Sequence, residues 1–231
     1  MLLLFDIDGT LLLGGSDAHR DAIVESLRIV HGIDKPARAP LGVAGRTDLD
    51  IAREILLASG VSARRIDARA DDFRIAACEA YARLVPDDLS HCVAPGMGEL
   101  LTNLAVRDGI VLALVTGNLQ PIARMKLRAA GIGKYFAGGQ GGFGSDHEDR
   151  SELPAIARRR AGEGNREPWP RERTIVIGDT PRDIACARAD GVRVVGIATG
   201  PYGVEELCEA DAVTRDAREL ESVLGEMLGA L

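Results

Sequence analysis

The first ten residues constrain the fold of this chain more than any other segment. Residues 2–5 read Leu-Leu-Leu-Phe, a continuous apolar run that is typical of a strand buried on both faces of a parallel sheet. Asp6 and Asp8 follow at once, and two unpaired carboxylates cannot carry such a strand further into a core. The strand therefore ends here, at the carboxyl edge of a sheet, where open α/β folds bind ligands. Because residues two apart on an extended chain point the same way, both carboxylates face one site.

Two carboxylates this close repel each other unless a positive group lies beside them. Mg²⁺ is a suitable partner, since it prefers carboxylate oxygens together with water and phosphate oxygens. With such an ion, one of the pair Asp6 and Asp8 could attack phosphorus while the other transfers a proton. A solvated turn rich in Asp and Gly is the alternative interpretation, and the short motif leaves both open.

Composition indicates a globular protein with a sizeable core. The 231 residues are 46% hydrophobic and 27% charged, which fits one large domain or one domain with a smaller one. Only 3% are aromatic, the net charge is −7, and the one basic run is Arg158-Arg159-Arg160, which we expect on a solvated helix face. Nucleic acid is therefore not expected as a partner.

The chain is also expected to be cytoplasmic. No apolar run is long enough to span a bilayer, so no membrane partner is expected. A strand that starts at residue 2 leaves no room for a signal peptide. The four cysteines are scattered without a paired motif, and we expect them to be buried thiols in a reducing compartment: Cys78, Cys92, Cys186 and Cys208.

Hydrophobic periodicity divides the chain into an all-helical segment and an alternating one. Between residues 14 and 90 no strand pattern occurs, and helices are predicted at 17–31, 48–58, 62–68 and 70–84, with a loop at 33–47. Beyond residue 95, strands are predicted at 110–115, 174–177, 192–197 and 211–214, between helices at 97–107, 119–130, 152–162, 182–190, 203–209 and 216–228, with a loop at 137–149. This alternation predicts an α/β fold with a parallel sheet and an inserted helical unit.

Polar residues follow three of the predicted strands. Thr116-Gly117-Asn118 ends the second strand and opens a helix, an arrangement that suits a phosphate or, equally, an ordinary helix cap. Asp179 follows the 174–177 strand, and Asp183 lies at the start of the next helix, where Asp is also a normal residue. Four carboxylates at one edge would raise one another's pKa values, and a bound Mg²⁺ is the simplest way to stabilise them.

Taken together, these segments resemble the haloacid dehalogenase superfamily of phosphatases. The matching motifs are Asp6-Ile7-Asp8-Gly9-Thr10, the strand-terminal Thr116, and Gly178-Asp179-Thr180-Pro181-Arg182-Asp183, in the family's order. The resemblance implies a Rossmann-like core of residues 1–13 and 91–231, with helices on both faces of the sheet. It also implies an inserted helical cap domain at residues 14–90, of the kind found in phosphoglycolate phosphatases and β-phosphoglucomutases.

The resemblance also implies a role for each motif residue. Asp6 would be the nucleophile that forms an aspartyl-phosphate, and Asp8 would protonate the leaving oxygen, activate water and offer its backbone carbonyl to Mg²⁺. Thr116 would bind the phosphoryl group with the backbone amides of Gly117 and Asn118. Two acids of the third motif would complete the metal site. Asp179 would bind the metal directly, and Asp183 would support it through water or a basic neighbour.

One departure from the family concerns its lysine, which normally lies shortly before the third strand's helix. No lysine occurs between residues 135 and 231. Arg150 occupies the corresponding place and keeps the charge, although a planar fork grips phosphate differently from an ammonium. Lys126 is the other candidate, but it lies in the middle of a predicted helix, where lysine is usually solvated.

The segment Gly42–Thr47 is a glycine-bearing loop before a helix, and related caps lower such a loop over the site. Arg46, next to Thr47, could pair with a substrate carboxylate or phosphate, or could be an ordinary exposed loop arginine. Gly14-Gly15 and Pro86-Asp87-Asp88 would be the hinges of the cap.

The expected activity is hydrolysis of a small phosphorylated metabolite, similar to phosphoglycolate, by a monomer or homodimer. A β-phosphoglucomutase would need an acid or base in the cap, for which His19 and Arg46 are available. A phosphonatase would need a cap lysine, and only Lys35 is present. A phospho-accepting receiver module is the alternative outside enzymes, although receivers lack a helical insert after the first strand.

Overall fold

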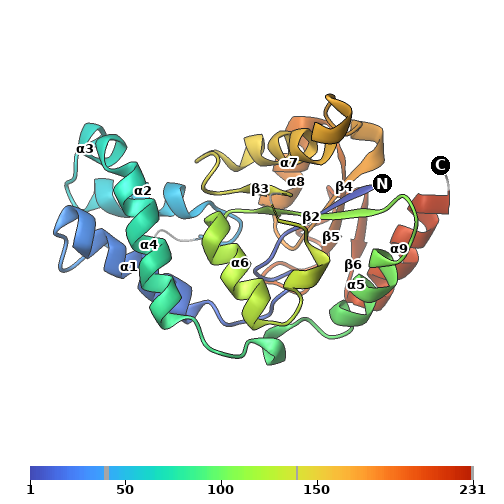
Figure 1. The fold of residues 1–231 in the computed structure, drawn as a ribbon, viewed down its shortest axis with the longest axis horizontal. Coiled ribbons are helices and arrows are strands. Elements are labelled where there is room, and N and C mark those ends of the chain that lie inside the picture. Colours follow the sequence, from blue (N-terminus) through green and yellow to red (C-terminus); the bar gives the residue numbers. More distant parts are fainter. Residues whose placement is uncertain (39–41, 139, 230–231) are drawn as a thin grey trace.

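The computed structural model describes residues 1–38, 42–138 and 140–229, so residues 39–41 of the predicted 33–47 loop lie outside it. Its core is a six-stranded parallel sheet with the strand order β3-β2-β1-β4-β5-β6 (Figure 1). The strands are β1 (Leu2–Phe5), β2 (Val111–Thr116), β3 (Gly142–Phe143), β4 (Thr174–Gly178), β5 (Arg193–Ile197) and β6 (Ala212–Thr214). The first strand of the chain is central, as its apolar sequence predicts.

Helices cover both faces of this sheet. Along β1, Leu3 and Phe5 pack into one hydrophobic cluster with α5, α6 and α9, whereas Leu2 and Leu4 pack into another with α7 and α8. The core helices are α5 (Met97–Ala105), α6 (Gln120–Ala129), α7 (Leu153–Gly162), α8 (Pro181–Asp190) and α9 (Ala217–Gly229). The alternation along β1 shows why a strand buried on both faces needs a continuous apolar sequence.

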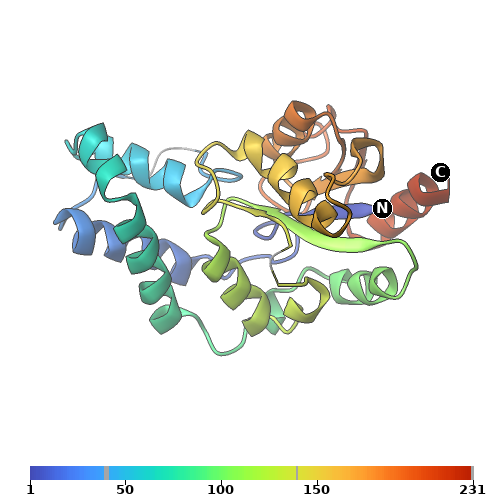
Figure 2. The ribbon, with the colours of Figure 1, turned by 45° about the horizontal axis from the view of Figure 1, so that its top comes forward.

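Four further helices lie together at one end of the molecule, at the left of Figure 1. They are α1 (Asp17–His31), α2 (Asp48–Ala58), α3 (Ala63–Ala68) and α4 (Ala70–Leu84). Their apolar faces form a hydrophobic cluster of their own, which also includes Leu119 and Ile122 at the start of α6. Figures 1 and 2 both show α6 between these helices and the sheet. The helical insert predicted from periodicity therefore rests on one helix of the core.

Two local predictions are wrong. The predicted loop at 137–149 contains the short edge strand β3, which pairs with the end of β2 through Val115 and Thr116. The predicted helix at 203–209 is a series of turns, because its backbone hydrogen bonds join residues three apart, as from Glu206 to Gly203. Leu207 is fully buried, so tertiary packing holds this segment in place without a helix.

The basic run is not a solvated face. Arg158 is buried and makes two hydrogen bonds, of 2.6 and 2.7 Å, to the carboxylate of Asp190. Arg160 pairs in the same way with Asp146, and only Arg159 is exposed and follows the prediction. The helical sequence pattern does not reveal which of these arginines is buried, because burial depends on a carboxylate partner that another element supplies.

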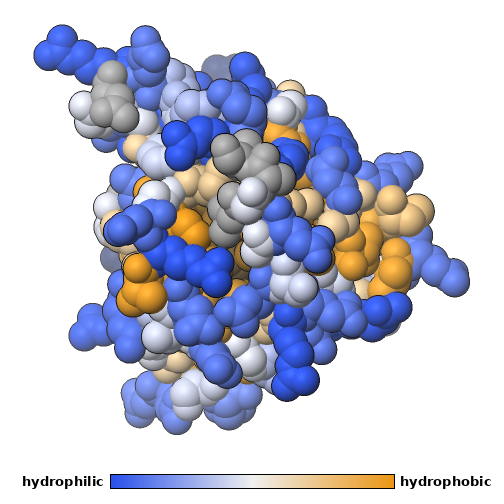
Figure 3. Space-filling model, turned by 90° about the vertical axis from the view of Figure 1, so that its right-hand side faces the viewer, coloured by the Kyte–Doolittle hydropathy of each residue, from blue (hydrophilic) through white to orange (hydrophobic). Residues whose placement is uncertain are grey.

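The prediction of four buried cysteines is only partly correct. Cys92 and Cys186 are buried and Cys78 is half-buried, whereas Cys208 is exposed; all four are free thiols. The end of the molecule opposite the helical insert is mainly hydrophilic, with several separate small hydrophobic areas (Figure 3). Among the residues described, no helix has both the length and the apolar character to cross a bilayer.

Candidate active site

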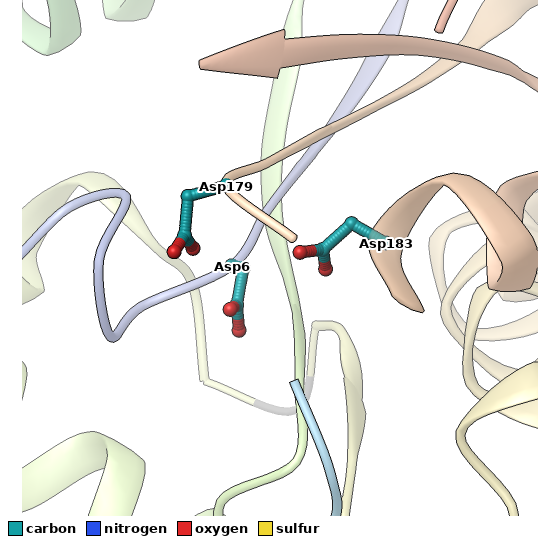
Figure 4. Close-up of side chains that lie close together, drawn as sticks. All are labelled: Asp6, Asp179 and Asp183. Carbon is teal, nitrogen blue, oxygen red and sulfur yellow. The ribbon is translucent and has the colours of Figure 1, made fainter. Parts of the chain in front are cut away.

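Three carboxylates converge at the carboxyl edge of the sheet. Asp6 directly follows β1, Asp179 directly follows β4, and Asp183 lies in the first turn of α8. One carboxylate oxygen from each residue lies within 4.8 Å of the other two, and all three side chains are buried. Figure 4 shows the three groups around one space, two of them from the β4–α8 segment and one from the end of β1. The strand ends predicted to meet therefore do meet.

Glycines allow the backbone to approach Asp179 closely. A Cβ atom on Gly9, which has a positive φ of 88°, would lie 2.2 Å from the Asp179 carboxylate, and one on Gly200 would lie 1.7 Å from it. Thr10 donates a hydrogen bond of 3.0 Å to Oδ1 of Asp179. Thr199 donates to the carbonyl of Gly9, which ties the β5 end to this turn. The two motifs are thus packed against each other with no room for larger residues.

Arg150 supplies positive charge to this cluster. The short 3₁₀ turn Arg150–Glu152 places its guanidinium 3.3 Å from the carboxylate of Asp6 and in hydrogen-bond contact with Asp183. The other oxygen of Asp183 accepts hydrogen bonds from the backbone and hydroxyl of Thr180, at 3.0 and 2.7 Å. Asp183 is thus held by protein groups on both of its oxygens.

The other two carboxyl groups are poorly compensated. Burial raises the pKa of Asp6 to about 7, against the opposing effect of Arg150. Burial and the neighbouring charges of Asp6 and Asp183 raise the pKa of Asp179 to about 8. Oδ2 of Asp179 is buried and has no hydrogen-bond partner among the described residues. A hard divalent cation such as Mg²⁺ would satisfy this oxygen and the excess negative charge, so these residues fit such an ion.

The carboxylate of Asp8 is held apart from this cluster. Both of its oxygens accept hydrogen bonds from Nζ of Lys126, at 2.8 and 2.7 Å, and one also accepts from the side chain of Asn118. Burial alone would raise its pKa, but the charge and hydrogen bonds of Lys126 outweigh burial and hold the pKa of Asp8 below its ordinary value. The predicted solvation of Lys126 is wrong, since only 1% of this residue is exposed.

The second motif lies beside Asp8. The hydroxyl of Thr116 accepts hydrogen bonds from the backbone and side chain of Asn118, at 3.4 and 3.1 Å. Oδ1 of Asn118 is buried without a partner among the described residues. The carbonyl of Gly117 accepts from the backbone of Asp48, so the helical insert contacts the core at this point. The three residues predicted to hold phosphate all line one cavity of about 310 Å³ with Asp6 and Asp8.

The loop before α2 closes this cavity from the other side. Arg46 lines it, but its guanidinium is paired with Asp50, at 2.6 Å, and with Glu54. Thr47 caps α2 by accepting from the backbone of Asp50, and its hydroxyl donates to the carbonyl of Glu148 in the core. Arg46 is therefore not an exposed loop arginine, and Thr47 joins the loop to the core.

Two residues of this region were not foreseen from the sequence. The carboxylate of Asp48 is hydrogen-bonded to His19 and to the backbone N–H of Leu119. The sequence gives no sign of this, because an acidic residue in the first turn of a helix is ordinary and is accounted for by the helix dipole. Thr199 follows a predicted strand, and a polar residue at the end of a strand is the sequence signal that could have marked it as a site residue. From the sequence, His19 is available only as an acid or base of a mutase.

Comparisons with known proteins agree with this architecture. The profile of the haloacid dehalogenase-like hydrolases matches residues 3–188. A probable phosphatase, IndB of Dickeya dadantii, is 27% identical over 211 residues, covering 91% of this chain and 86% of the relative. The tyrosine-protein kinase PtkA of Mycobacterium tuberculosis is 26% identical over 216 residues, covering 92% of this chain and 67% of the relative.

The fold is also found in solved structures. The crystal structure of CbbY from Rhodobacter sphaeroides in complex with phosphate has a TM-score of 0.65 to this chain at 22% identity, covering 95% of each chain. The resemblance noted in the sequence is confirmed by the profile, which spans more than three quarters of the chain. The protein belongs to the family of haloacid dehalogenase-like hydrolases.

Proposed function

We propose that this protein is a Mg²⁺-dependent phosphatase that hydrolyses a small phosphomonoester through an aspartyl-phosphate on Asp6. The observation that carries this proposal is the division of the acidic residues into two groups. Asp6 lies with Asp179 and Asp183 at the metal-suited cluster, whereas Asp8 is held beside it by Lys126. One carboxylate is thus available for attack and a separate one for proton transfer.

In the first step, an oxygen of Asp6 forms a bond to phosphorus while the bond from phosphorus to the substrate's ester oxygen breaks. Asp8 would take up a proton when the anionic substrate binds beside it, and it transfers this proton to the departing oxygen, so that an alcohol leaves and Asp6 carries the phosphoryl group. Thr116 and the backbone amides of Gly117 and Asn118 bind the phosphoryl oxygens, and Arg150 adds positive charge beside them.

In the second step, Asp8 takes a proton from water as the water oxygen forms a bond to phosphorus. The bond between phosphorus and Asp6 breaks, inorganic phosphate leaves, and both carboxylates return to their starting state. Asp6, Asp179 and the backbone carbonyl of Asp8 would hold Mg²⁺, with Asp183 supporting it through Arg150. The bound ion supplies positive charge against the negative charge of the phosphoryl oxygens.

The helical insert, which we take as a cap domain of residues 14–90 on a core of residues 1–13 and 91–231, would select the substrate. The 310 Å³ cavity adjoins a second one of about 510 Å³, and Arg46 and Arg150 line both. This space suits a small metabolite of the phosphoglycolate class. Because Arg46 is already paired with two carboxylates, its binding of a second substrate anion would require those ion pairs to open.

The experiment that tests the proposal measures turnover of p-nitrophenyl phosphate by the purified protein with Mg²⁺ and with a chelator. Steady turnover that needs Mg²⁺ and falls by at least about 10³-fold in Asp6→Asn is expected. Equal turnover after chelation, or an active Asp6→Asn protein, would contradict the proposal. A single stoichiometric phosphorylation without turnover would instead indicate a receiver-like module.

A further inference from the structure

Lys126 is unusual among the lysines of this chain. The sequence contains only three, and Lys35 and Lys134 are exposed. Lys126 lies on α6 with its side chain 1% exposed, and its ammonium contacts both oxygens of Asp8. A buried lysine is costly unless each of its hydrogens has a partner, so its contacts indicate what it does.

All three hydrogens of the ammonium are used by protein groups. Two are donated to the Asp8 oxygens, at 2.8 and 2.7 Å, and the third is donated to Nδ1 of His19, at 3.0 Å. An ammonium has three donors and no acceptor, so none remains for a substrate phosphate in this arrangement. This geometry disfavours Lys126 as the phosphate-binding counterpart of the family lysine, a role for which Arg150 is better placed.

The chain of contacts continues into the helical insert. Because Nδ1 of His19 accepts from Lys126, the ring proton lies on Nε2 and is donated to Asp48, at 3.0 Å. The same oxygen of Asp48 accepts from the backbone N–H of Leu119, at the start of α6, at 2.8 Å. The insert therefore satisfies an otherwise open end of α6 and, through His19, fixes the lysine on the next turns of that helix.

Resting on the proposed function, we propose that Lys126 is the positioning residue of Asp8 and that His19 and Asp48 make this positioning depend on the docked cap. Lys126 holds both oxygens of Asp8 away from the metal-suited cluster. The carboxylate of Asp8 is thereby kept as the proton-transfer group and does not become a further metal ligand beside the backbone carbonyl of Asp8. His19 holds the ammonium in register only while α1 and α2 lie against α6.

The test exploits leaving groups that differ in their need for a proton. p-Nitrophenolate is stable as an anion, whereas the phenolate leaving from phenyl phosphate is far more basic and depends on the general acid. The value of kcat/KM reports events up to cleavage of the ester bond, so it is independent of the later water attack. Lys126→Met should lower kcat/KM for phenyl phosphate by about 10²-fold and for p-nitrophenyl phosphate only a few-fold.

The control is Lys134→Met, which removes an exposed lysine and should leave both values unchanged. His19→Ala should shift the ratio of the two kcat/KM values in the same direction as Lys126→Met, by about 10-fold, because it leaves the Lys126–Asp8 contact in place but without its support. If Lys126→Met does not fold, His19→Ala alone carries the test, since His19 makes no hydrogen bond to Asp8. Thermal unfolding with and without Mg²⁺ verifies that each variant retains its fold and its metal response.

An equal loss for both substrates, or an unchanged ratio in the variants that fold, would overturn the positioning role. Failure of the proposed function looks different, because the unmodified protein would then hydrolyse neither substrate or would remain active as Asp6→Asn. The two ideas are therefore tested by separate measurements on the same set of proteins.

Discussion

The Arg150 guanidinium lies 3.3 Å from the carboxylate of Asp6, at the centre of the acidic cluster. Arg150 is buried, and its other contact is with Asp183, a carboxylate that is completely buried. Arg150 is therefore both a structural residue, through its ion pair with Asp183, and part of the proposed phosphate site. Removal of its positive charge should affect stability and activity together.

We expect Arg150→Met to destabilise the protein by about 3–5 kcal/mol, because it leaves buried carboxylates without their cation. We expect kcat/KM to fall by about 10²–10³-fold. Arg150→Lys keeps the charge and should lose less stability and less activity than Arg150→Met. Chemical denaturation and p-nitrophenyl phosphate turnover measure the two effects, and a Met variant as stable as the Lys variant would contradict the prediction.

Mg²⁺ should stabilise the protein more at high pH. Burial raises the pKa of Asp6 to about 7 and that of Asp179 to about 8 in the metal-free protein. Because these folded-state values exceed the unfolded ones, the stability that the two acids contribute is complete below about pH 4 and is lost as pH rises through 7 and 8. Above this range both carboxylates are charged and Mg²⁺ need not displace protons.

At 100 times its Kd, Mg²⁺ adds about 2.7 kcal/mol, which corresponds to a rise in Tm of about 5–10 °C. We expect this rise at about pH 9 and a clearly smaller one at about pH 6 with the same Mg²⁺ concentration. Thermal unfolding with Mg²⁺ or chelator at both pH values gives the comparison. Asp179→Asn should abolish the difference, and a larger rise at the lower pH would show that these acids do not bind the ion.

Gly117→Ala should disturb the contact between the helical insert and the core. A Cβ atom at Gly117 would lie 2.0 Å from the backbone carbonyl oxygen of Arg46, so one of the two segments must move. We expect kcat/KM to fall at least about tenfold, since a small misplacement of site groups is costly. Gly98→Ala on α5 is the matched control, because its Cβ meets open space, and it should keep activity and gain about 0.5–1 kcal/mol.

Arg158→Met should destabilise the fold without acting on the chemistry. It removes the bidentate partner of Asp190, whose side chain is 3% exposed, and should cost about 3–5 kcal/mol in chemical denaturation. Arg159→Met, at the neighbouring exposed position, should change stability by less than about 0.5 kcal/mol. Similar losses for the two variants would mean that the buried ion pair does not hold α7 to α8.

The strand ends were predictable because their signal is local. An apolar run that stops at Asp6, or at Gly178-Asp179, identifies the end of a buried strand without knowledge of its neighbours. Parallel pairing then brings these ends to one edge, as the structure shows for β1 and β4. The short strand β3 was missed because two residues are too few for any periodicity.

The partners of the long basic side chains were not predictable in the same way. Within a helical sequence, Lys126 and Arg158 look the same as solvated residues, yet both are buried against carboxylates that other elements supply. Asp48 likewise looks like an ordinary first-turn residue, although it joins the insert to α6.

The amino-acid sequence by itself determined the parallel α/β core, the helical insert and the acidic groups of the site, because periodicity and strand ends are properties of single segments. Only the tertiary structure decided which cation meets which carboxylate: Arg150 lies beside Asp6, and Lys126 beside Asp8. The physical reason is that such pairings depend on how separate helices stack on the sheet, and the stacking is set by the whole hydrophobic core.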